Sequence, residues 1–100
     1  MLYMIYGEDL PNSLEKRTKV RPVHMERIQG LIEAGRLILA GPLPAVDSAE
    51  PGPAGMAGSL IVAEFDSLEE AREWIDGDPY VTQGVFAHVT VRPFKQIFPA

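Results

Sequence analysis

The chain contains no cysteine, so disulfide bridges, thiolate metal sites and cysteine nucleophiles are all excluded. It has only two histidines, which argues against a histidine-rich metal site. Basic residues are also few, 9 against 14 acidic ones, and the formal charge of −5 argues against a nucleic-acid surface. No apolar run is long enough to span a bilayer, and we expect no charged-then-apolar leader. We therefore expect a soluble, cytoplasmic protein.

What remains is ordinary for a globular protein. The apolar share of 46% and the charged share of 23% are typical of soluble domains. One hundred residues is the usual size of a single domain, and it is enough to bury a core without covalent staples. We therefore treat residues 1–100 as one domain.

Four segments have the composition or the alternation of β-strands. They cover residues 2–7, 36–43, 59–65 and 85–94. Between the second and third strands, residues 44–58 read PAVDSAEPGPAGMAG, a loop rich in proline and glycine without apolar period. Its glycines do not lead from a strand into a helix, so a phosphate-binding loop is a poor interpretation. We expect this loop to act as a surface lid.

A first helix is predicted from Pro22, which suits the first helical position, to a stop at Gly35. Met25, Ile28 and Ile32 recur there at helical spacing, which places His24 in the first turn. A shorter helical piece, which Ser13 could cap, precedes it.

A second helix is predicted after Ser67, because Ser67 and Glu70 have the spacing of a capping box. Leu68, Ala71 and Ile75 would form its apolar stripe, and Gly77 would end it.

The element order is β-α-β-β-α-β, which predicts an α+β ferredoxin-like fold with a four-stranded antiparallel sheet in the order 4-1-3-2. Both helices then cover one face of the sheet. The first three strands are nevertheless apolar on nearly both sides, a pattern typical of strands that are buried on both faces. The simplest second cover is another copy of the sheet, so we predict a homodimer that packs sheet to sheet.

The same topology brings distant residues to one rim of the sheet: His24, Gly41, Pro42, Ser59 and Asp78 should converge beside the 44–58 loop. A carboxylate can orient an imidazole and fix its tautomer, and the pair can then move protons, so His24 and Asp78 are the predicted catalytic residues. Two simpler interpretations stay open. His24 could be a partly buried histidine bonded to a backbone carbonyl, and Asp78 could simply cap the turn that Pro79 begins.

The other candidates have less support. Arginines on helix one could meet a substrate carboxylate or phenolate, although solvated helix arginines are the commoner case, and tyrosines on the first strand are more often core or interface residues. No nucleophile-elbow pattern surrounds the serines, which argues against a serine hydrolase. His88 is interpreted as structural or as part of a subunit contact. The predicted substrate-binding residues are Tyr6, Arg17, Gly41, Pro42, Ser48, Ser59 and Pro79.

Several segments together carry a resemblance to a known family. They read MLYMIYG, SLEKR, VRPVHMERI, GRLILAGPLPAVDS, AEFDSLEEAREW and DPYVTQGV, followed by PFK. The chain closely resembles the YCII-related family over nearly its whole length, and His24, the AGP element and the DPY element are the most specific parts.

The resemblance implies a ferredoxin-like fold that pairs into a dimeric α+β barrel, with a site centred on His24 and Asp78. One relative eliminates HCl from a chlorinated hydroxyquinol, and similar barrels include muconolactone isomerases. By analogy we expect the chain to be an acid/base enzyme of lyase, dehydrochlorinase or isomerase type, acting on a small cyclic or aromatic compound without metal or organic cofactor. The alternative is a non-catalytic, small-ligand-binding or stress-associated dimer.

Overall fold

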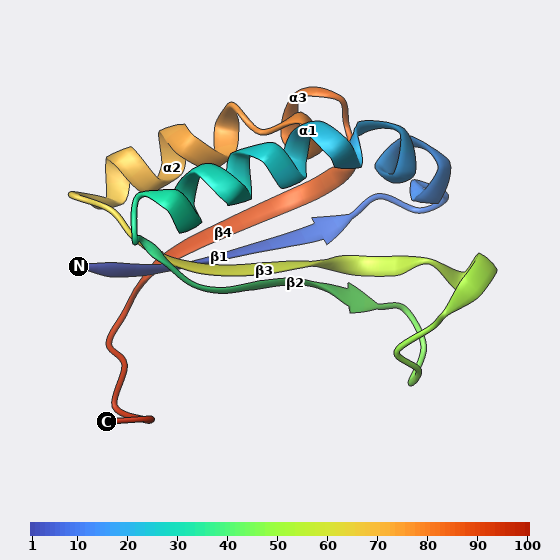
Figure 1. The fold of residues 1–100 in the computed structure, drawn as a ribbon. Coiled ribbons are helices and arrows are strands. Elements are labelled where there is room, and N and C mark those ends of the chain that lie inside the picture. The colour runs from blue at the N-terminus through green and yellow to red at the C-terminus, as the bar shows by residue number, and fades with distance from the viewer.

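The computed structural model describes all residues, 1–100. In chain order its elements are β1 (Leu2–Asp9), α1 (Leu14–Glu33), β2 (Leu37–Pro44), the 3₁₀ turn η1 (Gly52–Ala54), β3 (Met56–Glu64), α2 (Leu68–Asp76), α3 (Pro79–Thr82) and β4 (Phe86–Phe94). The strands form one antiparallel sheet in the order β2-β3-β1-β4 (Figure 1), which confirms the predicted ferredoxin-like arrangement. None of the helices combines the length and the apolarity needed to cross a membrane.

Helix α1 differs from its prediction, because it is one continuous helix of 20 residues with Pro22 in its interior. A proline there removes one backbone hydrogen bond, yet the residues that the helix buries lie on both sides of it. They are Arg17, His24, Ile28 and Leu31. Burial of this stripe holds the helix across Pro22, since helices in proteins owe most of their stability to packing. His24 therefore lies in mid-helix, and the prediction that it occupies a first turn is wrong.

The predicted apolar stripe of α1 also needs correction. Met25 and Ile32, which we expected to face inward, are 46% and 49% exposed. Helix α2 shows the same kind of difference at its start, where Leu68 is exposed while Ala71 and Ile75 are fully buried. Its N-terminal cap is present as predicted, because the Ser67 hydroxyl accepts a hydrogen bond from the Glu70 N–H at 3.0 Å.

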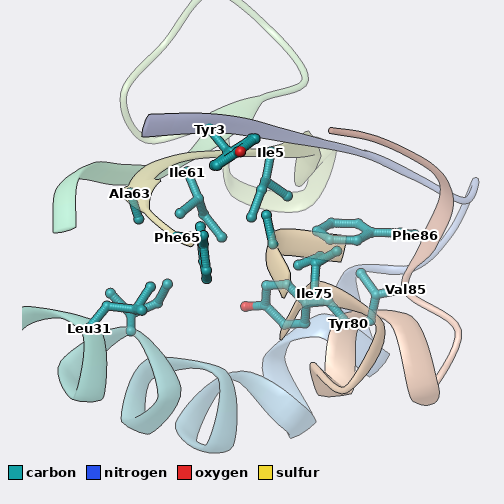
Figure 2. Close-up of a cluster of buried hydrophobic side chains, with 12 residues drawn as sticks. Tyr3, Ile5, Leu31, Ile61, Ala63, Phe65, Ile75, Tyr80, Val85 and Phe86 are labelled. Atoms are coloured by element: carbon teal, nitrogen blue, oxygen red, sulfur yellow. The ribbon is translucent and has the colours of Figure 1, made fainter. Parts of the chain in front are cut away.

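The hydrophobic core fills the space between the helices and one face of the sheet (Figure 2). Tyr3 and Ile5 of β1 and Ile61 and Ala63 of β3 supply the side chains from the sheet. Tyr80 of α3 reaches into this layer, and it is the largest of the fully buried side chains. The short helix α3 is therefore anchored in the core rather than lying on the surface.

The opposite face of the sheet carries no helix (Figure 1). The strand register places Leu39, Val62 and Met4 in one row across β2, β3 and β1 on this face. Leu39 is 48% exposed, and Phe94 at the end of β4 is 37% exposed. An apolar surface of this kind is typical of a contact site for another protein.

Candidate active site

The side chains of His24 in α1 and Asp78 at the start of α3 meet in the interior. The Nδ1 atom of His24 lies 3.0 and 2.9 Å from the two carboxylate oxygens of Asp78. A carboxylate can only accept, so Nδ1 carries the hydrogen. The other ring nitrogen, Nε2, has no hydrogen-bond partner within the chain. Since no fully buried side-chain nitrogen or oxygen lacks a partner, Nε2 must be open to the adjacent cavity.

Asp78 has two further donors besides the ring. One of its oxygens accepts the backbone N–H of Tyr80 at 2.9 Å, which caps α3, and the other accepts Nη1 of Arg27 at 3.1 Å. The cap and the contact with His24 are therefore compatible, and Asp78 makes both. Burial alone would raise the pKa of Asp78, but hydrogen bonding and charge from His24, the Tyr80 N–H and the Arg27 charge hold that pKa below its ordinary value. Asp78 is thus an anion at neutral pH.

Acidification should remove a stabilising contribution of Asp78. Because the folded-state pKa of this carboxyl lies below its unfolded value of about 3.9, its contribution is present above that value. It is lost as the pH falls through the folded-state pKa. The difference in free energy of unfolding between wild type and Asp78→Asn should therefore shrink, on the order of 1 kcal/mol, between about pH 5 and about pH 2.5.

Urea titrations at the two pH values measure this difference. Asp76→Asn is the matched control, because Asp76 is a largely exposed acid two positions before Asp78 in the sequence. Its Oδ1 atom lies 3.6 Å from Nε of Arg72, so it too has an arginine partner. It should show a much smaller pH dependence. A wild-type advantage over Asp78→Asn that stays constant across this range would contradict the low pKa of Asp78.

Tyr80 forms one wall of the site. Its ring stacks on the imidazole of His24 with 4.0 Å between ring centroids and an interplanar angle of 15°. The guanidinium carbon of Arg17 lies 4.6 Å from the centre of the same ring. Burial raises the pKa of Tyr80 despite the opposing positive charges of Arg17 and Arg21, so the phenol stays neutral at physiological pH.

Arg17 is buried, and a dense set of acceptors neutralises and orients it. Its Nε and Nη2 atoms donate to the two carboxylate oxygens of Asp9 at 2.9 and 3.0 Å. Nη2 also donates to the Gly58 carbonyl at 3.0 Å and to the Ser59 hydroxyl at 2.9 Å. Such a two-pronged arginine–carboxylate pair has a fixed geometry, so Arg17 ties β1, α1 and β3 together behind the cavity.

The cavity beside Nε2 has a volume of about 240 Å³, which suits a small molecule. Its polar lining comes from Arg17, Arg21, His24, Ser59 and Tyr80. Its other lining residues are Met25, Ile28, Ala40, Gly41, Pro42 and Ile61. The cavity therefore offers one basic nitrogen, hydrogen-bond donors and an apolar surface. No three His, Asp or Glu side chains gather so that they could hold a metal ion.

The structure brings most of the predicted site residues to this cavity. Arg17, His24, Gly41, Pro42 and Ser59 all line it. Asp78 lies behind the imidazole, fully buried, and Pro79 follows it without lining the cavity.

Tyr6 and Ser48 are not brought to the site, which corrects two expectations. Tyr6 has the same orientation as Met4, toward the uncovered face of the sheet, because side chains alternate along a strand. Its hydroxyl donates to Glu8 at 3.3 Å. Ser48 lies in the β2–β3 loop, where its hydroxyl accepts the Glu50 N–H at 3.1 Å.

The β2–β3 loop is likewise not a lid over this cavity, since none of residues 45–55 lines it. The loop lies instead against the start of α1, where a Cβ atom on Gly55 would be 3.3 Å from Cβ of Leu14.

Two residues that complete the site, Asp9 and Tyr80, were missed in the sequence. Tyr80 directly follows Asp78 and Pro79 in the chain, and this closeness to Asp78 could have indicated that it belongs to the site.

The fold and the cavity define a ferredoxin-like α+β protein with a histidine–carboxylate contact beside a small cavity. The YCII-related domain matches residues 1–95. The chain belongs to the YCII-related family, as the resemblance predicted.

Individual relatives agree with this assignment. Protein YciI of Escherichia coli O6:H1 is 58% identical over 98 residues, covering 98% of this chain and 100% of that protein. An uncharacterized protein of Haemophilus influenzae is 47% identical over the same shares. Among solved structures, 5-chloro-2-hydroxyhydroquinone dehydrochlorinase from Burkholderia phenoliruptrix AC1100, in complex with 2,5-dihydroxybenzoquinone, has a TM-score of 0.83 and 27% identity. The similarity covers 95% of this chain and 94% of that one.

Proposed function

We propose that this protein is a cofactor-independent acid/base enzyme of lyase, dehydrochlorinase or isomerase type that acts on a small cyclic or aromatic compound. One observation carries the proposal: Asp78 holds the hydrogen of His24 on Nδ1, and Nε2 opens to the cavity. A neutral imidazole in this tautomer presents a lone pair to whatever the cavity holds. The similarity to a dehydrochlorinase that binds a six-membered quinone supports the substrate class.

In the proposed reaction Nε2 takes a proton from a hydroxyl or carbon of the substrate. The carboxylate of Asp78 stabilises the imidazolium that forms, because the two groups lie 2.9 Å apart and both are buried. In an isomerisation the proton returns to a different atom of the substrate. In an elimination the leaving group departs as an anion with the electron pair of its bond, and Nε2 later gives the proton to water.

The test measures turnover of 5-chloro-2-hydroxyhydroquinone, by chloride release without oxygen, and hydrogen exchange into dihydroxylated quinones in D₂O, by NMR. Wild type should turn over at least one of these compounds, and His24→Gln should be slower by roughly 10²-fold or more, the usual scale for general acid/base assistance. His88→Gln is the control, since His88 lies on β4 and does not line the cavity, and its turnover should match that of wild type. Turnover that survives His24→Gln would contradict the proposal. Binding without any turnover would favour the non-catalytic alternative.

We also propose that two copies pair through the uncovered face of the sheet. No helix covers the apolar row that includes Leu39, Val62 and Met4 (Figure 1), and Leu39 in this row is 48% exposed. A stable contact of this kind buries about 800 Å² on each partner. Exposed His88 lies across from Glu8 on this face, so it belongs to the polar part of the same surface.

A further inference from the structure

The charged side chains that line the cavity are all positive. Two arginines, Arg17 and Arg21, line it, and no aspartate or glutamate does. This is unexpected for a chain whose formal charge is −5. The acids that belong to the site, Asp9 and Asp78, lie behind its wall, where they bind Arg17 and His24. An entering molecule therefore meets positive charge and no carboxylate.

Arg21 differs from the arginines around it. Arg17 is paired with Asp9 at 2.9 Å, and Arg27 is paired with Asp78 at 3.1 Å. Arg21 lies on the same helix, is exposed at the cavity, and makes no ion pair or side-chain hydrogen bond. It is thus the lining arginine whose five donors stay available. The charge of Arg21 also acts inside the cavity, because it lowers the pKa of the Tyr80 phenol, against the larger rise that burial causes.

We infer that the substrate of this site is an anion, and that Arg21 is the specificity-determining residue that holds its carboxylate, phenolate or enolate oxygen. This inference rests on the cavity of the proposed function and adds the charge of the compound that enters it. A guanidinium binds such oxygens through two parallel hydrogen bonds, while the apolar Met25, Ile28 and Ile61 contact the rest of a ring. Positive charge at this place also stabilises the additional negative charge that develops when Nε2 takes a proton.

The experiment measures binding, with no turnover required. The anionic probe is 2,5-dihydroxybenzoquinone, which is ionised at neutral pH, and the uncharged probe of similar size is hydroquinone. Wild type should prefer the anionic probe, and added salt should weaken that preference. Arg21→Gln should weaken binding of the anionic probe by about 10-fold to 100-fold, the range for a hydrogen bond to a charged group. Binding of hydroquinone should change by less than about twofold, because an uncharged probe gains little from the guanidinium charge.

Lys19→Gln is the matched control, because it removes the same charge from the same helix at a residue outside this cavity. It should leave both dissociation constants within about twofold, since an exposed charge beyond the cavity is largely screened by salt. Equal weakening of both probes by Arg21→Gln, or equal effects of Arg21→Gln and Lys19→Gln, would overturn the inference. A wild type without preference for the anionic probe would overturn it too. If wild type binds the anion through Arg21 but turns nothing over, the proposed enzyme fails and the anion site stands.

Discussion

Asp78→Asn is expected to slow turnover of a true substrate by roughly 10²-fold to 10⁴-fold, because it reverses the tautomer of His24. The carboxylate oxygens accept hydrogens from the Tyr80 N–H and from Arg27 as well as from the imidazole. In asparagine the single oxygen keeps the cap on the Tyr80 N–H, so the amide NH₂ takes the place of the other carboxylate oxygen, which lies 2.9 Å from Nδ1 of His24. An NH₂ group there donates to Nδ1, and the imidazole hydrogen moves to Nε2. The nitrogen that faces the cavity then has no lone pair to accept a proton.

The ¹⁵N chemical shifts of the imidazole nitrogens report this change directly, since protonated and bare ring nitrogens differ widely. The exposed His88 serves as internal control in the same spectra. Asparagine caps a helix nearly as well as aspartate, so α3 should persist in Asp78→Asn. If Asp78 only capped α3, the ¹⁵N chemical shifts of His24 would be unchanged in Asp78→Asn, and turnover would stay within about twofold of wild type. The catalytic role of Asp78 would then have to be abandoned.

The meeting of His24 and Asp78 could be predicted from the order of the elements, although the helix start from which His24 was placed was wrong. An antiparallel β-α-β-β-α-β chain brings the region after β1 and the end of α2 to the same rim, whatever the side chains are. Ser59, Gly41 and Pro42 reach the cavity for the same reason, since their strands pass that rim. Such predictions need only element order, which hydrophobic periodicity indicates well.

The errors concern places where tertiary packing outweighs a local signal. Pro22 suggested a helix start, but burial of Arg17 and His24 on either side of it holds one continuous helix. Arg17 itself looked like a solvated residue. Its burial depends on Asp9, eight positions away across the turn into α1, and on the Gly58 carbonyl of β3. No spacing rule connects those three groups.

The position of Tyr6 could not be predicted for a different reason. It depends on which face of β1 the helices cover. The alternation of β1 defines two faces without assigning them, since both are apolar. In the structure Tyr3 and Ile5 belong to the helix side, and Met4 and Tyr6 belong to the other. A correct assignment requires the core partners of the whole sheet. The apolar character of the second face was nevertheless informative, because it predicted a surface that the chain itself leaves uncovered.

Wild type should sediment at twice the chain mass at micromolar concentration, and Leu39→Glu should sediment as a monomer. Leu39 lies in the apolar row of the uncovered sheet face, 48% exposed, so a carboxylate there would be buried without a partner in a sheet-to-sheet dimer. A cost of several kcal/mol in each subunit is enough to dissociate a contact of standard size.

Ile32→Glu is the matched control, because Ile32 is 49% exposed but lies on α1, on the other side of the sheet. It introduces the same charge at nearly the same exposure, and the dimer should survive it. Sedimentation equilibrium of the three proteins separates the outcomes. A monomeric but folded wild type would refute pairing altogether. A dimer that resists Leu39→Glu and dissociates with Ile32→Glu would place the contact on the helices, because only a surface buried between subunits is sensitive to a new charge.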